Sequence, residues 1–218
     1  MTDEIQAPSP MPTPVISTNR LEAFSDGVFA IVITLLVLEL RLPPVPGGGP
    51  GPLAPRLLAM APQFVAYAIA FVIVGMTWIG HHGLFHLISR TDKTLMWLNL
   101  LILICVSFVP FPSMVLGLYP MHPVAIRLFA GTMLLASLSY NLAWWYAMKE
   151  CRLIRRDLDP EVCRQQTLRG LQFIGIYALA LAGSFLHPIA GLVMLAIMPL
   201  SFIFPSRFDP RHFKAVRP

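Results

Sequence analysis

Polar and ionisable side chains stand next to long apolar stretches in the first half of this sequence. Ser25 and Asp26 precede the run GVFAIVITLLVL, and His81 and His82 lie near the end of an uncharged run that begins at Leu57. A carboxylate near imidazoles can relay protons, attract cations or hydrogen-bond neighbouring helices. Within a membrane span a carboxylate costs a few kcal/mol unless it finds partners. We therefore expect Asp26 and Ser25 to bond donors on adjacent helices, and the candidate partners are Trp78, His81, His82 and Asn99.

The predicted helix that holds Ser25 and Asp26 has a second, apolar side. At about 100° per residue, one stripe collects Ile31, Thr34, Leu35 and Leu38. Ser25 and Asp26 point to the opposite side, toward whatever helices pack there. An aliphatic stripe on a membrane helix usually contacts lipid or another helix, and spacing alone does not distinguish these from a pore.

Composition indicates that lipid is the solvent for most of this chain. Of its 218 residues 56% are hydrophobic and only 12% charged, with a mean hydropathy of +0.68, values that exclude an ordinary water-soluble domain. The net charge of +5 resides in clusters between apolar runs. These clusters are typical of topology signals and not of nucleic-acid binding.

Other function classes find no support in the motifs. Cys105, Cys151 and Cys163 form no CxxC pair and have no metal-ligand spacing, so neither a metal site nor a cofactor is predicted. No HExxH, GxSxG or paired-aspartate arrangement lies within the apolar runs, so the sequence does not indicate an enzyme.

The apolar runs predict an all-α integral membrane protein with six transmembrane helices. The first includes charge, because only 12 uncharged residues separate Asp26 from Glu39, whereas a span needs about 20 residues. Asn19 is its expected N-cap, and the prolines and glycines of residues 41–56 exclude regular structure there. The expected spans cover residues 20–40, 57–89, about 94 to 119, 123–148, 170–186 and 188–204.

Charge distribution orients these spans with both termini in the cytoplasm. In that orientation only Arg41, Arg56 and Arg127 of the 16 Lys and Arg residues lie outside, as the positive-inside rule requires. Residues 1–18 are expected to be a disordered Pro-rich tail, residues 19–204 the membrane domain and residues 205–218 a basic cytoplasmic tail.

One motif resembles a known family. The string RxxxFSDG, formed by Arg20, Phe24, Ser25, Asp26 and Gly27, looks like the signature of the transmembrane protein 175 family of endolysosomal potassium channels and their bacterial relatives. The segments WIGHHGLF and NLLILICVSFVPFPS are similar to that family's second and third helices. We interpret the signature residues as a structural network that orients helices, and we favour that role over direct ion binding.

The resemblance implies the bacterial, single-repeat form, in which four copies in the bacterial inner membrane surround a potassium pore lined by the first helix. The constriction would then fall on Ile31, Leu35 and Leu38, with Thr34 as the flanking hydroxyl. Two alternatives stay open at this stage. One is a proton-coupled or small-solute transporter using Asp26 with His81 and His82, and the other is a channel that passes monovalent cations or protons with little discrimination.

Overall fold

The described part of the chain is almost entirely helical. The computed structural model describes residues 18–42, 51–149, 153–155 and 158–203. The helices are α1 (Thr18–Leu35), the 3₁₀ helix η1 (Leu36–Glu39), α2 (Leu53–Ala59), α3 (Ala61–Leu87), α4 (Lys93–Ser107), α5 (Pro110–Leu118), α6 (Pro123–Met148), α7 (Pro160–Leu186) and α8 (Pro188–Ile203).

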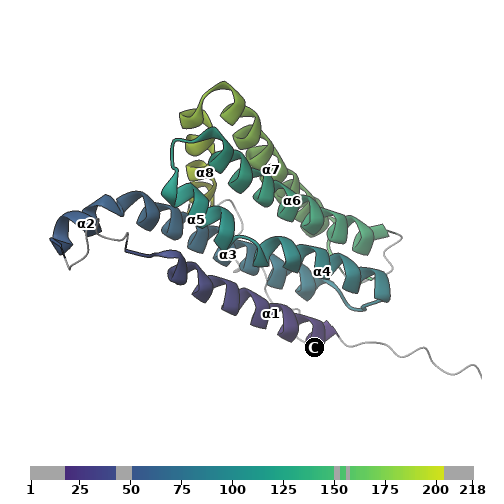
Figure 1. Ribbon diagram of the computed structural model, residues 1–218. Coiled ribbons are helices and arrows are strands. Elements are labelled where there is room, and N and C mark those ends of the chain that lie inside the picture. The colour runs from purple at the N-terminus through teal and green to yellow at the C-terminus, as the bar shows by residue number, and fades with distance from the viewer. Residues whose placement is uncertain (1–17, 43–50, 150–152, 156–157, 204–218) are drawn as a thin grey trace, which may run out of the picture.

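The helices form two groups that share α3 and α4 as their common layer. In Figure 1, α1 lies along one side of α3 and α4, and α6, α7 and α8 gather on the other side. Each side of α3 and α4 therefore meets a different part of the chain, and the main packing partners of α1 are these two helices. In the described part of the chain, that arrangement leaves the other face of α1 exposed.

Five helical stretches are long and apolar enough to span a bilayer. They are Thr18–Glu39, Ala61–Leu87, Lys93–Leu118, Pro123–Met148 and Pro160–Leu186. Helix α8 is apolar but has only 16 residues, fewer than the about 20 that a typical span requires. The six-span count therefore stays a prediction, while the all-helical character and the apolar spans are present.

Two local expectations are wrong. Asn19 lies within α1 and is not an N-cap, and residues 53–56 of the linker are helical because they begin α2. The third expected span is present as one apolar stretch, Lys93–Leu118, and its helix is interrupted at Phe108 and Val109, where α4 ends and α5 starts. Pro110, which follows directly, lacks an N–H and its ring crowds the preceding turn. The tails at residues 1–17 and 204–218 and the linker at 43–50 lie outside the described residues.

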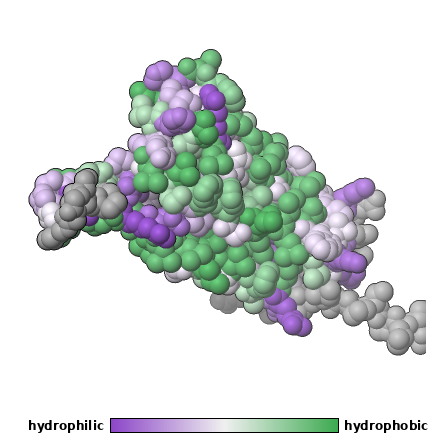
Figure 2. Space-filling view, viewed as in Figure 1, coloured by the Kyte–Doolittle hydropathy of each residue, from purple (hydrophilic) through white to green (hydrophobic). Residues whose placement is uncertain are grey.

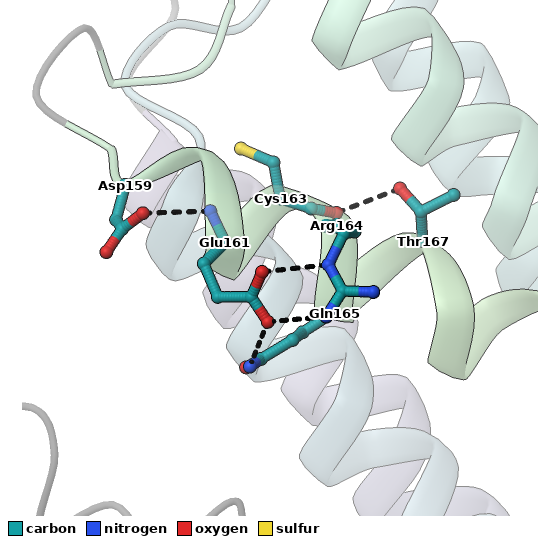
Figure 3. A network of polar contacts seen from close by, with 6 residues as sticks. All are labelled: Asp159, Glu161, Cys163, Arg164, Gln165 and Thr167. Atoms are coloured by element: carbon teal, nitrogen blue, oxygen red, sulfur yellow. Dashed lines mark hydrogen bonds and ion pairs between the residues drawn. The ribbon is translucent and has the colours of Figure 1, made fainter.

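Helix α7 begins ten residues before the predicted Gly170, and its first turn explains why. The Asp159 carboxylate accepts a hydrogen bond from the Glu161 backbone N–H at 2.8 Å, and Pro160 occupies the first helical position, which it favours. Figure 3 shows the Arg164 guanidinium in a bidentate salt bridge with the Glu161 carboxylate. Both N···O distances are 2.8 Å. Capping and this surface pair extend α7 beyond its apolar part into the basic segment.

Candidate pore helix and its polar anchor

Helix α1 has one buried face and one exposed face. The buried face repeats every three or four residues, as expected for a helix that packs along one side, and consists of Leu21, Ser25, Phe29, Val32 and, in η1, Leu36. The opposite face is exposed over its whole length: Ile31 and Leu38 each keep 59% of their surface and Leu35 keeps 40%. Thr34 lies on the same exposed face.

A chain of hydrogen bonds ties the buried face of α1 to α4 and α3. Asn99 on α4 donates from Nδ2 to the Ser25 hydroxyl at 2.9 Å, and the Ser25 hydroxyl donates to the Leu21 carbonyl at 2.8 Å. His81 on α3 lies 2.7 Å from Asn99 through its Nε2 atom. All three polar side chains are buried.

The bonding pattern assigns the proton on His81. The Asn99 amide nitrogen is used toward Ser25, so the atom facing His81 is the Asn99 carbonyl oxygen, an acceptor. His81 Nε2 must therefore carry a proton and donate it. The ring also lies between Phe29 and Phe85, with centroid distances of 5.3 and 4.6 Å. His81 is thus a donor held in an apolar slot.

Asp26 has a separate partner on α3. The Trp78 indole N–H donates to the Asp26 carboxylate at 2.8 Å, and both residues stay partly accessible. His82 stacks on Trp78 with a centroid distance of 6.1 Å and is exposed. Asp26 thereby bonds α3, whereas Ser25 bonds α4 through Asn99, so α1 is held at two points.

The remaining signature residues lie on the exposed face. Arg20, Phe24 and Gly27 are exposed, and a methyl group placed on Gly27 would meet no atom within 4 Å. Within the described part of the chain, only Ser25 and Asp26 of the signature bond to other helices. The motif is thus divided between a face that anchors α1 and a face that is open.

A second polar cluster, unforeseen from the sequence, joins α6 to α3 and α7. The Tyr140 hydroxyl donates to the Gly80 carbonyl at 2.8 Å and accepts from Gln166 at 2.6 Å. Two further bonds link α6 to α7, from Trp144 to Thr167 at 2.9 Å and from Asn141 to the Gly170 carbonyl at 3.1 Å. The sequence signal for this cluster was the polar pair Gln166 and Thr167, which we expected in a loop. Both residues lie in α7, because that helix begins earlier than expected.

These contacts make α3 and α4 a rigid support for α1. Hydrogen bonds between membrane helices contribute about 0.6 kcal/mol each on average and up to about 1.7 kcal/mol, so the chain from His81 to Ser25 and the Trp78 contact together fix the rotation of α1. No group of three or more His, Cys, Asp or Glu residues is positioned to hold a metal among the described residues. The arrangement orients a helix and does not form a reaction centre.

Comparison with known proteins places this arrangement in a family. Residues 20–110 match the family described as endosomal/lysosomal potassium channel TMEM175. A potassium channel of Chamaesiphon minutus is 38% identical, over 78% of this chain and 85% of that protein. The crystal structure of a lysosomal potassium-selective channel TMEM175 homologue from the same organism superposes with a TM-score of 0.75, at 32% identity, over 85% of this chain and 96% of that one.

The animal relatives are longer. The endosomal/lysosomal proton channel TMEM175 of Mus musculus is 34% identical over 61% of this chain, which covers 29% of that protein. The bacterial relative matches over most of both chains, and its solved homologue shares the fold. This chain therefore belongs to the TMEM175 family.

Proposed function

We propose that this protein is one subunit of a homotetrameric potassium channel in the bacterial cell membrane, with the exposed face of α1 lining the central pore. The chain would cross the membrane six times, with α8 as the sixth span and both termini in the cytoplasm. The names of two relatives support potassium as the permeating ion, because the bacterial protein and the solved homologue are both potassium channels.

The observation that carries this proposal is the unequal environment of the two faces of α1. The anchored face bonds α3 and α4 through Asp26 and Ser25, whereas Ile31, Leu35 and Leu38 are exposed in the described part of the chain. A helix that presents one stripe to a shared axis needs a fixed rotation, which this polar anchor supplies.

The mechanism that fits this stripe is gating by dewetting. Rings of Ile31 and Leu35 from four subunits would exclude water until the α1 helices rotate or splay. The Thr34 hydroxyl donates to the Ile31 carbonyl at 2.8 Å, which leaves the hydroxyl lone pairs available to a passing cation. Selectivity would then come from pore width and these oxygen dipoles, without a ring of backbone carbonyls.

Substitution within the stripe tests the proposal. Ile31→Asn should raise potassium conductance or reduce the preference for potassium over sodium in planar bilayers, because a polar ring lowers the cost of wetting the constriction. Val37→Asn is the matched control, since Val37 is 48% exposed but lies off the stripe. Unchanged currents in Ile31→Asn would remove Ile31 from the constriction.

A second candidate, proton conduction or proton-coupled transport through Asp26 and the histidines, is favoured by one observation: the mammalian relative is a proton channel. Reconstituted vesicles separate the two functions. A potassium channel collapses an imposed potassium gradient without a pH gradient, whereas a proton-coupled carrier requires one. Loss of proton flux in His81→Gln, with potassium flux retained, would support the second candidate.

A further inference from the structure

The surface between α4 and α6 contains an open groove that the proposed pore does not use. Its volume is about 440 Å³, within the range of about 300–1,000 Å³ typical of ligand sites. Ile104 lines it from α4, Phe108 lines it from the residue directly after α4, and Leu128, Gly131 and Leu135 line it from α6. Figure 2 shows that hydrophobic side chains cover most of the face formed by these helices.

Gly131 leaves open space in one wall of the groove. A methyl group placed on Gly131 would meet no atom within 4 Å, so a larger side chain at this position would occupy part of the groove. The lining residues of α6 follow one another at spacings of three or four residues and therefore share a face. The groove is therefore apolar and runs along the helix axis.

One cation stands at the end of this groove. Arg127 is the fifth residue of α6, about 6 Å along the axis from the start of the helix, which corresponds to the headgroup region in the proposed topology. Its guanidinium donates to the Ser184 carbonyl at 3.3 Å and lies 3.9 Å from the centre of the Phe185 ring. Its Nε is buried and has no hydrogen-bond partner among the described residues, so a headgroup would approach the two terminal nitrogens, and none of the described carboxylates pairs with the guanidinium.

We infer that the groove binds one acyl chain of an anionic phospholipid whose phosphate pairs with Arg127. Charge complementarity identifies the headgroup, because a guanidinium at the edge of the bilayer whose positive charge has no carboxylate partner suits a phosphate better than a neutral ligand. Length identifies the tail: Arg127 to Leu135 spans about 12 Å of helix, close to the about 15 Å of hydrocarbon in one leaflet. The charged end and the apolar end thus match a single lipid.

Native mass spectrometry of the full-length protein tests the site, with equal amounts of phosphatidylglycerol and phosphatidylcholine carrying identical acyl chains in the detergent. We expect wild type to retain phosphatidylglycerol preferentially. Arg127→Gln should weaken that retention about tenfold and leave the weaker phosphatidylcholine binding unchanged. Arg41→Gln, which removes an exposed cation elsewhere, is the matched control and should change neither.

A second variant keeps the inference testable if loss of the Ser184 contact prevents Arg127→Gln from folding. Gly131→Leu places a side chain into the groove from a position whose Cβ would meet no atom within 4 Å; it should reduce retention of both lipids, with unchanged elution on size exclusion. Retention of phosphatidylglycerol equal to wild type in Gly131→Leu would overturn the site. Cys105 also lines the groove, so a cross-link tests whether a second copy occupies it. In a Cys151→Ser, Cys163→Ser background, coupling of two copies through Cys105 by a short bismaleimide would also overturn the lipid site.

Discussion

Replacement of Asn99 by leucine isolates the contribution of the anchor under α1. Leucine matches asparagine closely in size and suits an apolar span, but it removes the acceptor for His81 and the donor for Ser25. His81 Nε2–H would be left buried without a partner, which costs about 1–3 kcal/mol. Ser25 keeps its bond to the Leu21 carbonyl and loses one of two, which costs about 0.5–1 kcal/mol.

The sum predicts that Asn99→Leu lowers the free energy of unfolding by about 1.5–4 kcal/mol. Unfolding in mixed detergent micelles, followed by circular dichroism, measures that change. Thr77→Val is the matched control, because the Thr77 hydroxyl bonds only the Ile73 carbonyl of its own helix; we expect a change below about 1 kcal/mol.

A double-mutant cycle sharpens the test. Ser25→Ala removes the acceptor that Asn99 uses, so Ser25→Ala and Asn99→Leu together should cost less than the sum of the two single changes, by about 0.5–2 kcal/mol. Additive effects, or an Asn99→Leu protein within about 0.5 kcal/mol of wild type, would refute a hydrogen-bonded anchor beneath α1.

Two further substitutions test the contacts around α1 and between α6 and α7. Asp26→Asn keeps an oxygen that accepts from Trp78, so it should retain most of the proposed tetramer when its mass is measured by light scattering after size exclusion, whereas Asp26→Leu should lose it. Equal loss in both would show that the contact does not depend on the accepted hydrogen bond. Gly170→Ala places a methyl group against the Asn141 side chain and should destabilise the protein by about 1–3 kcal/mol in thermal unfolding. Gly175→Ala, with open space around it, is the control and should be close to neutral. A neutral Gly170→Ala would mean that α6 and α7 can separate at no cost.

Much of the helical architecture follows from hydropathy alone, because a chain in lipid must satisfy its backbone within helices. The starts of α6 and α8 at Pro123 and Pro188 follow from proline at the first helical turn. The start of α7 was missed because hydropathy changes at Gly170, whereas the helix is capped at Asp159. Capping chemistry and not hydrophobicity sets that boundary.

The candidate site was predictable where it depends on helical periodicity and was not where it depends on packing between distant helices. A 3.6-residue period is enough to put Ile31 and Ser25 on different faces of one helix. It does not determine that Trp78 bonds Asp26 while the adjacent His82 only stacks. The link from Tyr140 to Gly80 and Gln166 joins segments separated by 60 and 26 positions, and only the crossing of α6 over its neighbours creates it.

Cysteine accessibility along α1 tests the proposed pore most directly. In a background with Cys105, Cys151 and Cys163 replaced by serine, external silver ions should block potassium current irreversibly in Ile31→Cys and Leu35→Cys channels. The same ions should leave Val32→Cys and Leu36→Cys channels conducting, because both side chains are buried. Val32 lies in α1, which packs against α3 and α4, and Leu36 lies in η1, which packs against α5 and α3. Block at the buried positions, or none at Ile31 and Leu35, would contradict a pore lined by the exposed face of α1.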